Sequence, residues 1–166
     1  MSARDPDLAT AGAVLEETLA PEAIYGRAAE RARSMELAYA GALTPREAWR
    51  LHQAGAGIIV DVRTLPEWEF VGRVPDTILV EWRGFQEQQP NPNFLRQLTE
   101  ACSRDEPLLF LCRSAVRSHH AAEAAARAGF ARSYNILEGF EGNLDARRQR
   151  GALGGWRAAG LPWEQS

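Results

Sequence analysis

The sequence has few of the features that mark membrane, secreted or nucleic-acid-binding proteins. Its 166 residues contain no apolar run near the roughly 20 residues that a transmembrane helix needs. The formal net charge is only -3 and the sequence pI is about 5.7, which argues against a protein held to nucleic acid by phosphate contacts. The N-terminal residues are acidic and lack the basic segment followed by an apolar segment that marks a signal peptide. We therefore expect no signal peptide and a cytoplasmic protein.

Cysteine and histidine are also scarce. The two cysteines, Cys102 and Cys112, are ten residues apart, and a single bridge over so short a loop would be a poor disulfide framework. We therefore expect free thiols in a reducing compartment. Of three histidines, His119 and His120 are adjacent, so they diverge by about 100° on a helix. The sequence accordingly predicts no metal site and no cofactor.

One stretch stands out in what is present. The wholly apolar run Leu108 to Leu111 predicts a buried strand, and an alanine-rich helix follows from about Ser118 to Ala128. Cys112 comes at the junction of the two. The free N–H groups and the positive dipole end of a helix N-terminus favour a thiolate over a thiol at such a position.

Strands and helices are expected to alternate along the rest of the chain, which predicts an α/β fold with a mostly parallel sheet. The predicted strands span 57–62, 77–80, 108–111 and 133–137, and the predicted helices span 44–53, 66–70, 94–103, 118–128 and 152–159. Ligands of such sheets bind at the carboxyl ends of the strands. Asp61, Arg63 and Cys112 all follow predicted strands, so we expect them to share a site.

The first forty residues differ from the rest. After Pro21, apolar residues recur on one helical face: Ile24, Ala28, Ala32, Met35 and Tyr39. A shorter helix is expected over 14–19. We therefore divide the chain into an N-terminal helical extension, residues 1–40, and a main domain, residues 41–163. The extension either packs on the domain, associates with a second copy, or docks a protein partner.

Charged and hydroxyl groups crowd the residues after Cys112. The amides of residues 113–118 are expected to form an anion cradle. The Ser118 hydroxyl is expected to add either an N-cap or a direct hydrogen bond. Arg113 and Arg117 would supply the bidentate grip that arginine gives an oxyanion. His119 is a further candidate acid or base, although its place in the first turn favours a solvent-facing side chain. The alternative is that Cys112 is a buried core cysteine, which leaves the surrounding arginines and serines unexplained.

These residues resemble the rhodanese-like sulfurtransferase domains. The resemblance is carried by Leu111-Cys-Arg-Ser-Ala-Val-Arg-Ser118, by Asp61-Val-Arg63 with Glu67-Trp-Glu-Phe70, by Gly72-Arg-Val-Pro75, by Tyr134-Asn-Ile-Leu-Glu-Gly139, and by Gly155-Trp156 with Ala159-Gly-Leu-Pro162. It covers about residues 42–163. The chain departs from the family pattern at Arg73-Val-Pro-Asp-Thr77 and at Gly139-Phe140, and residues 1–40 have no counterpart in the minimal domain.

The resemblance implies a doubly wound, five-stranded parallel sheet with helices on both faces. Cys112 would be the catalytic nucleophile, taking a sulfane sulfur from an anionic donor such as thiosulfate and passing it, through a persulfide, to a thiol or cyanide. The loop Arg113, Ser114, Ala115, Val116 and Arg117, with Ser118 and Arg63, would bind the substrate.

Two alternatives remain open at this point. Phosphatase and arsenate reductase relatives use the same fold, but the phosphatase loop Cys-X5-Arg is one residue longer than the Cys-X4-Arg loop here. A persulfide-relay or docking module with little turnover is the other alternative.

Overall fold

The computed structural model of the protein describes residues 18–166, which form a five-stranded parallel sheet. The strands are β1 (Gly41–Leu43), β2 (Ile58–Asp61), β3 (Ile78–Leu79), β4 (Leu108–Leu111) and β5 (Ser133–Ile136). Their order is β1-β5-β4-β2-β3, so β4 is the central strand and every neighbouring pair is parallel. The predicted α/β class and parallel sheet are confirmed.

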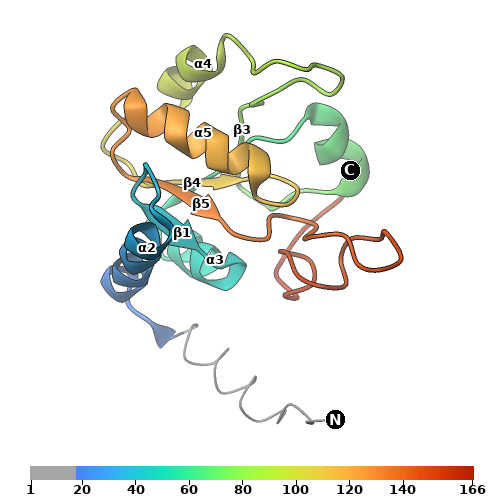
Figure 1. Ribbon diagram of the computed structural model, residues 1–166, viewed down its shortest axis with the longest axis horizontal. Helices are drawn as coiled ribbons and strands as arrows, with labels where there is room; N and C mark the ends of the chain where they lie inside the picture. The colour runs from blue at the N-terminus through green and yellow to red at the C-terminus, as the bar shows by residue number, and fades with distance from the viewer. Residues whose placement is uncertain (1–17) are drawn as a thin grey trace.

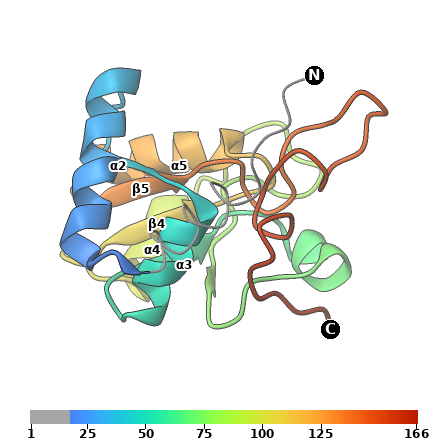
Figure 2. The same cartoon turned by 90° about the horizontal axis from the view of Figure 1, so that it is seen from below.

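Helices cover both faces of the sheet. Figure 1 shows α4 and α5 over one face, and α2 and α3 over the other, and Figure 2 gives the same layers in a second view. The helices are α2 (Pro21–Met35), α3 (Pro45–Gln53), the short π-helical turn η1 (Glu67–Val71), α4 (Phe94–Ala101) and α5 (Val116–Arg127). This is the doubly wound arrangement expected from the sequence.

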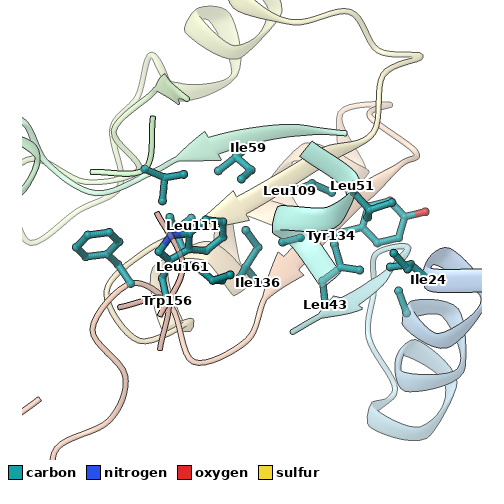
Figure 3. Close-up of a cluster of buried hydrophobic side chains, with 14 residues drawn as sticks. Ile24, Leu43, Leu51, Ile59, Leu109, Leu111, Tyr134, Ile136, Trp156 and Leu161 are labelled. Atoms are coloured by element: carbon teal, nitrogen blue, oxygen red, sulfur yellow. The ribbon is translucent and has the colours of Figure 1, made fainter. Parts of the chain in front are cut away.

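The run Leu108 to Leu111 is buried because β4 has a hydrophobic cluster on each face. Leu109 and Leu111 pack with the residues of α2 and α3 in the cluster that Figure 3 shows. Leu108 and Phe110 point to the opposite cluster, beneath α4 and α5. Alternate residues of a strand face opposite sides, so a strand buried on both sides must be apolar throughout.

The start of α3 follows from its sequence. The Thr44 hydroxyl accepts a hydrogen bond from the amide of Glu47, and the Glu47 carboxylate accepts one from the amide of Thr44. This capping box, with Pro45 in the first turn, satisfies amides that the helix itself cannot bond. Glu47 is fully buried and also accepts two hydrogen bonds from Arg31 of α2. The ion pair therefore joins the two helices of this face.

The helix α2 packs directly on the sheet. Ile24 and Ala28 are fully buried in the same cluster as the β1 and β5 side chains, whereas Met35 is half exposed. The helix ends at Met35, so Tyr39 is buried from the connecting segment and not from the predicted helical stripe. The helix expected over 14–19 lies mostly outside the described residues. The division at residue 40 stays a prediction.

One detail of the sequence prediction is wrong. The closing helix expected over 152–159 is a series of turns. Gly155 has a φ of +103°, and a Cβ there would come within 2.6 Å of the amide nitrogen of Gly142. The positive φ of Gly155 is incompatible with a right-handed helix, whose residues have negative φ. The close approach of the two backbone segments leaves no room for a side chain, so this position requires glycine.

Candidate active site

Cys112 lies at the carboxyl end of the central strand. It follows β4 directly, and α5 begins four residues later at Val116. Only 1% of its surface is exposed. The predicted position at a strand-to-helix junction is therefore confirmed, and protein atoms cover almost all of the cysteine.

The loop after Cys112 presents free backbone donors. Ala115 adopts the left-handed conformation, with φ of 74°, and turns the chain into α5. Within residues 18–166, none of the six amides from Arg113 to Ser118 donates a hydrogen bond to a protein acceptor. Consecutive unsatisfied amides at a helix N-terminus are an anion-binding arrangement. The cradle expected from the sequence is thus available for a ligand.

A turn at residues 139–142 holds the loop from its carbonyl side. The amide of Phe140 donates to the carbonyl of Cys112 at 2.8 Å, and the amides of Glu141 and Gly142 donate to the carbonyl of Arg113. Gly139, with φ of +68°, lies so close that a Cβ would be 2.5 Å from the carbonyl carbon of Arg113. These bonds occupy the loop carbonyls and leave the amides free.

Behind the loop, buried polar groups contact the thiol. The Sγ of Cys112 lies 3.2 Å from the hydroxyl of Ser118, and that hydroxyl donates to the Oδ1 of Asn135 at 2.6 Å. The Nδ2 of Asn135 donates to the carbonyl of Ala115 at 3.2 Å. Ser118 is fully buried and Asn135 nearly so. Ser118 therefore has the predicted contact with the thiol, and Asn135 is an unpredicted member of the network.

Arg117 does not reach into the site as a free cation. Both of its terminal nitrogens donate to the carboxylate of Glu67, each at 2.8 Å. Burial alone would raise the pKa of Glu67, but the hydrogen bonds and charge of Arg117, with the bonds from Thr64, lower it from 4.5 to about 2. The ion pair fixes the end of the loop to η1, whose sequence lies fifty residues earlier.

A pocket of about 350 Å³ opens over the loop. Its lining contains four arginines and two glutamates: Thr64, Glu67, Val71, Arg83, Gly84, Phe85, Arg113, Arg117, Glu141 and Arg150. Within the described part of the chain, Arg83 and Arg113 have no carboxylate at ion-pair distance. The pocket therefore carries excess positive charge on a chain of net charge -3, which suits an anionic ligand.

Of the loop residues predicted to bind the substrate, only Arg113 and Arg117 line this pocket, and Cys112 itself is not part of the lining. Arg113 and Val116 are exposed, and Ser114 and Ala115 are half-buried. Sequence reasoning missed Arg83, Phe85 and Arg150 as lining residues. Arg83 follows β3, so the rule that sites form at the carboxyl ends of strands could have found it. Arg150 comes from an irregular segment with no such signal.

Arg63 does not line the pocket. It is fully buried, with hydrogen bonds to the carboxylate of Asp61 and, at 2.8 Å, to the carbonyl of Gly72. Its guanidinium lies 4.3 Å from the centre of the Phe140 ring. The expectation that Asp61, Arg63 and Cys112 meet at the carboxyl edge holds for their strands, but the first two pair with each other. The buried ion pair of Asp61 and Arg63 packs against Phe140 of the 139–142 turn, which indicates a structural role.

His119 and His120 lie on α5, away from the pocket lining. The Nδ1 of His119 is 2.7 Å from the hydroxyl of Tyr39. His119, His120 and Glu123 have ligand atoms within 4.8 Å of one another, because both imidazoles bend toward the shared carboxylate despite their divergence on the helix. They are a candidate metal-binding group of the described residues, and the absence of a metal stays a prediction.

The molecule has a larger hollow of about 460 Å³ beside α3, lined by Arg46, Trp49 and the 160–162 segment, but no nucleophile lies there. Among residues 18–166, no helix is both long and apolar enough to cross a bilayer. The candidate nucleophile, Cys112, lies at the carboxyl edge of the sheet. A central parallel strand that ends at a buried cysteine, followed by unpartnered amides at a helix N-terminus, defines a class of α/β proteins with a thiol beside an anion-binding arrangement.

The comparisons with known proteins agree with this class. The model of the Rhodanese-like domain matches residues 44–146, so the chain belongs to the rhodanese-like domain family. It is similar to Rv0390 from M. tuberculosis, whose crystal structure has 48% sequence identity and a TM-score of 0.70, over 77% of this chain and 99% of that one. An uncharacterized protein of Rickettsia prowazekii is 37% identical over 108 residues, which are 64% of this chain and 81% of the relative.

The fold also resembles that of a polysulfide-sulfur transferase homodimer from Wolinella succinogenes. That likeness has a TM-score of 0.53 and 20% sequence identity, over 81% of this chain and 87% of the other. At this identity the likeness concerns the fold alone.

Proposed function

We propose that the protein is a sulfurtransferase that carries a sulfane sulfur as a persulfide on Cys112. The observation that carries the proposal is the run of six amides, residues 113–118, that have no acceptor within the described chain and directly follow a buried cysteine at a helix N-terminus. Such a cradle stabilises the negative terminal sulfur of a persulfide without any acid or base.

The first half-reaction loads the cysteine. The Cys112 thiolate attacks the outer sulfur of thiosulfate, a new S–S bond forms, and the S–S bond of thiosulfate breaks. Sulfite leaves with the bonding electron pair, and the terminal sulfur on the enzyme keeps a negative charge. The exposed Arg83 and Arg113 favour the approach of this dianion.

The second half-reaction unloads it. A thiolate acceptor attacks the terminal sulfur, the persulfide bond breaks, and the Cys112 thiolate is regenerated as its leaving group. Cyanide reacts in the same way to give thiocyanate. After both half-reactions Cys112 is again a thiolate, so the enzyme has the same oxidation state at the start and end of each cycle. The proposed reaction therefore requires no cofactor.

The short loop supports sulfur over phosphate as the group transferred. Four residues separate Cys112 from Arg117, and the guanidinium of Arg117 is occupied by Glu67. A tetrahedral phosphate at a cysteine needs a wider loop and a free arginine for bidentate contact. Hydrolysis of an aryl phosphate that depends on Cys112 would reverse this ranking.

The test is the intact mass of the protein after incubation with thiosulfate and removal of the donor. We expect one added sulfur on the wild type and none on Cys112→Ala. The matched control is Cys102→Ala: burial raises the pKa of the Cys102 thiol to about 11, so it stays protonated and the variant should load as the wild type does. Equal loading of Cys112→Ala and the wild type, or loading of neither by any sulfane donor, would exclude the proposal.

A persulfide-relay module is the second proposal that the same site supports. It would load from a protein persulfide and show little turnover with small thiols. Purified protein that loads one sulfur yet discharges it slowly to every small acceptor would favour the relay over the free-standing enzyme.

A further inference from the structure

The hydroxyl of Ser118 has one hydrogen and two neighbours that could receive it. The Oδ1 of Asn135 is 2.6 Å away and the Sγ of Cys112 is 3.2 Å away. The sequence prediction left this hydroxyl either as an N-cap or as a direct hydrogen-bond partner at the site. Its hydrogen cannot serve both atoms at once, because a hydroxyl donates a single hydrogen bond.

The orientation of the Asn135 amide decides where the hydrogen goes. The Nδ2 of Asn135 donates to the carbonyl of Ala115, which can only accept, so the amide nitrogen must face the loop. The amide oxygen then faces Ser118, and two oxygens 2.6 Å apart require a hydrogen between them. Only Ser118 can supply it. The side of the Ser118 oxygen that faces Cys112 is therefore a lone pair, which accepts from S–H and repels a thiolate.

We infer that Asn135 is a positioning residue which, by holding the hydrogen of Ser118, opposes ionisation of the free Cys112 thiol. The inference rests on the proposed function only in taking Cys112 as the reacting group. A persulfide has no hydrogen on its inner sulfur and carries its charge on the outer one, so it leaves the bond between Ser118 and Asn135 intact and uses the loop amides alone. The network thus accommodates the thiol and the persulfide and disfavours the bare thiolate.

Tyr39 forms a hydrogen bond with the side chain of Asn135. Burial raises the pKa of Tyr39 to about 12, against the opposing effect of its hydrogen bond with the side chain of Asn135, so the phenol stays protonated. Its hydroxyl also contacts the Nδ1 of His119 at 2.7 Å. Tyr39 precedes the span 44–146 that the family model matches. The segment before the matched domain therefore contributes to the network behind the cysteine.

The charged groups near Cys112 leave this hydroxyl as the variable element. Arg117 of α5 is neutralised by Glu67 of η1, and Asp61 after β2 is neutralised by Arg63. Behind the network, His119 faces Glu123 of the same helix. Neither Ser118 nor Asn135 is a member of any of these pairs.

The experiment is a titration of the Cys112 thiolate by its ultraviolet absorbance, with no sulfur donor present. Each variant is measured against the same variant carrying Cys112→Ala, in a Cys102→Ala background. Asn135→Leu, which keeps the volume without an acceptor, frees the Ser118 hydroxyl to donate to the sulfur. A hydrogen bond to a charged group then moves the midpoint down by roughly one pH unit.

Ser118→Ala separates positioning from a structural role. In the wild-type background the Ser118 oxygen offers the sulfur only a lone pair, so its loss should leave the midpoint unchanged or lower it, whereas beside Asn135→Leu it should raise the midpoint by roughly one unit. An upward shift of a full unit from Ser118→Ala alone would overturn the inference, and so would an unchanged or higher midpoint in Asn135→Leu.

If Asn135→Leu does not fold, Ser118→Ala alone decides between a committed and a donating hydroxyl. Because the titration needs no sulfur transfer, it can succeed where the loading experiment fails, and the reverse is equally possible. The two proposals are therefore tested separately.

Discussion

The ion pair between Glu67 and Arg117 should contribute measurable stability that depends on pH. We consider Glu67→Gln, which removes the charge and keeps the shape. Lowering the pKa of Glu67 from 4.5 to about 2 corresponds to about 3 kcal/mol if fully expressed. The two side chains are 14% and 16% exposed, so solvent screening reduces this, and we expect a loss of about 1–2 kcal/mol at pH 7.

The sign of the pH dependence follows from the direction of the shift. The folded-state pKa is lowered, so the stabilisation is complete above the unfolded value near 4.5 and is lost as the pH falls toward 2. The unfolding free energies of wild type and Glu67→Gln, measured by urea denaturation, should differ at pH 7 and converge toward pH 2.

The matched control is Glu100→Gln, which breaks an exposed i,i+4 pair with Arg96 whose side chains are 63% and 59% exposed. Exposed helical pairs contribute about 0.3–0.5 kcal/mol, so this variant should be nearly neutral. Equal stability of Glu67→Gln and wild type at pH 7, or a difference that persists unchanged to low pH, would refute the reasoning.

Three further substitutions test the parts of the site. Gly139→Ala should abolish sulfur loading in a protein that is still folded by circular dichroism, because the new Cβ would meet the Arg113 carbonyl at 2.5 Å; normal loading would contradict the role of the turn. Arg63→Leu should lower the free energy of unfolding by about 3 kcal/mol or more, since it leaves the Asp61 carboxylate buried and unpaired, whereas a substrate-binding role would raise the KM for thiosulfate in a stable protein. Arg83→Gln should raise that KM severalfold with little change in kcat, as measured by steady-state thiocyanate formation, and an unchanged KM would exclude Arg83 from donor binding.

Local sequence signals predicted the elements that position the site. The capping box at Thr44 and Glu47 and the apolar strand before Cys112 depend on neighbours within a few residues, so they are legible in the sequence. The carboxyl-end rule then located Cys112 correctly, because in a parallel sheet that edge is common to all strands.

The ion pairs between residues distant in the sequence could not be predicted from the sequence. Arg113 and Arg117 look equivalent in the sequence, yet the first is exposed and the second is bound to Glu67, fifty residues away. Arg63 looks like a site residue because it follows a strand, but its guanidinium turns inward to Asp61 and Phe140. Which arginine remains free depends on tertiary contacts that no local pattern records.

The closing segment shows the limit of propensity. Ala152, Ala158 and Ala159 favour a helix by composition, whereas the pair Gly154-Gly155 in the middle of the segment disfavours one. The backbone approach at Gly155 and the full burial of Trp156 then impose turns.

The place of β1 in the sheet has a practical consequence for where the folding unit ends. The matched span of the family begins at residue 44, after β1, and ends at residue 146, before the buried Trp156. A fragment of residues 44–146 would lose the strand that covers β5 and the Arg31 partner of buried Glu47. The unpaired backbone edge of β5 would then be an open template for strand addition, so such a fragment is expected to aggregate more readily than the full chain.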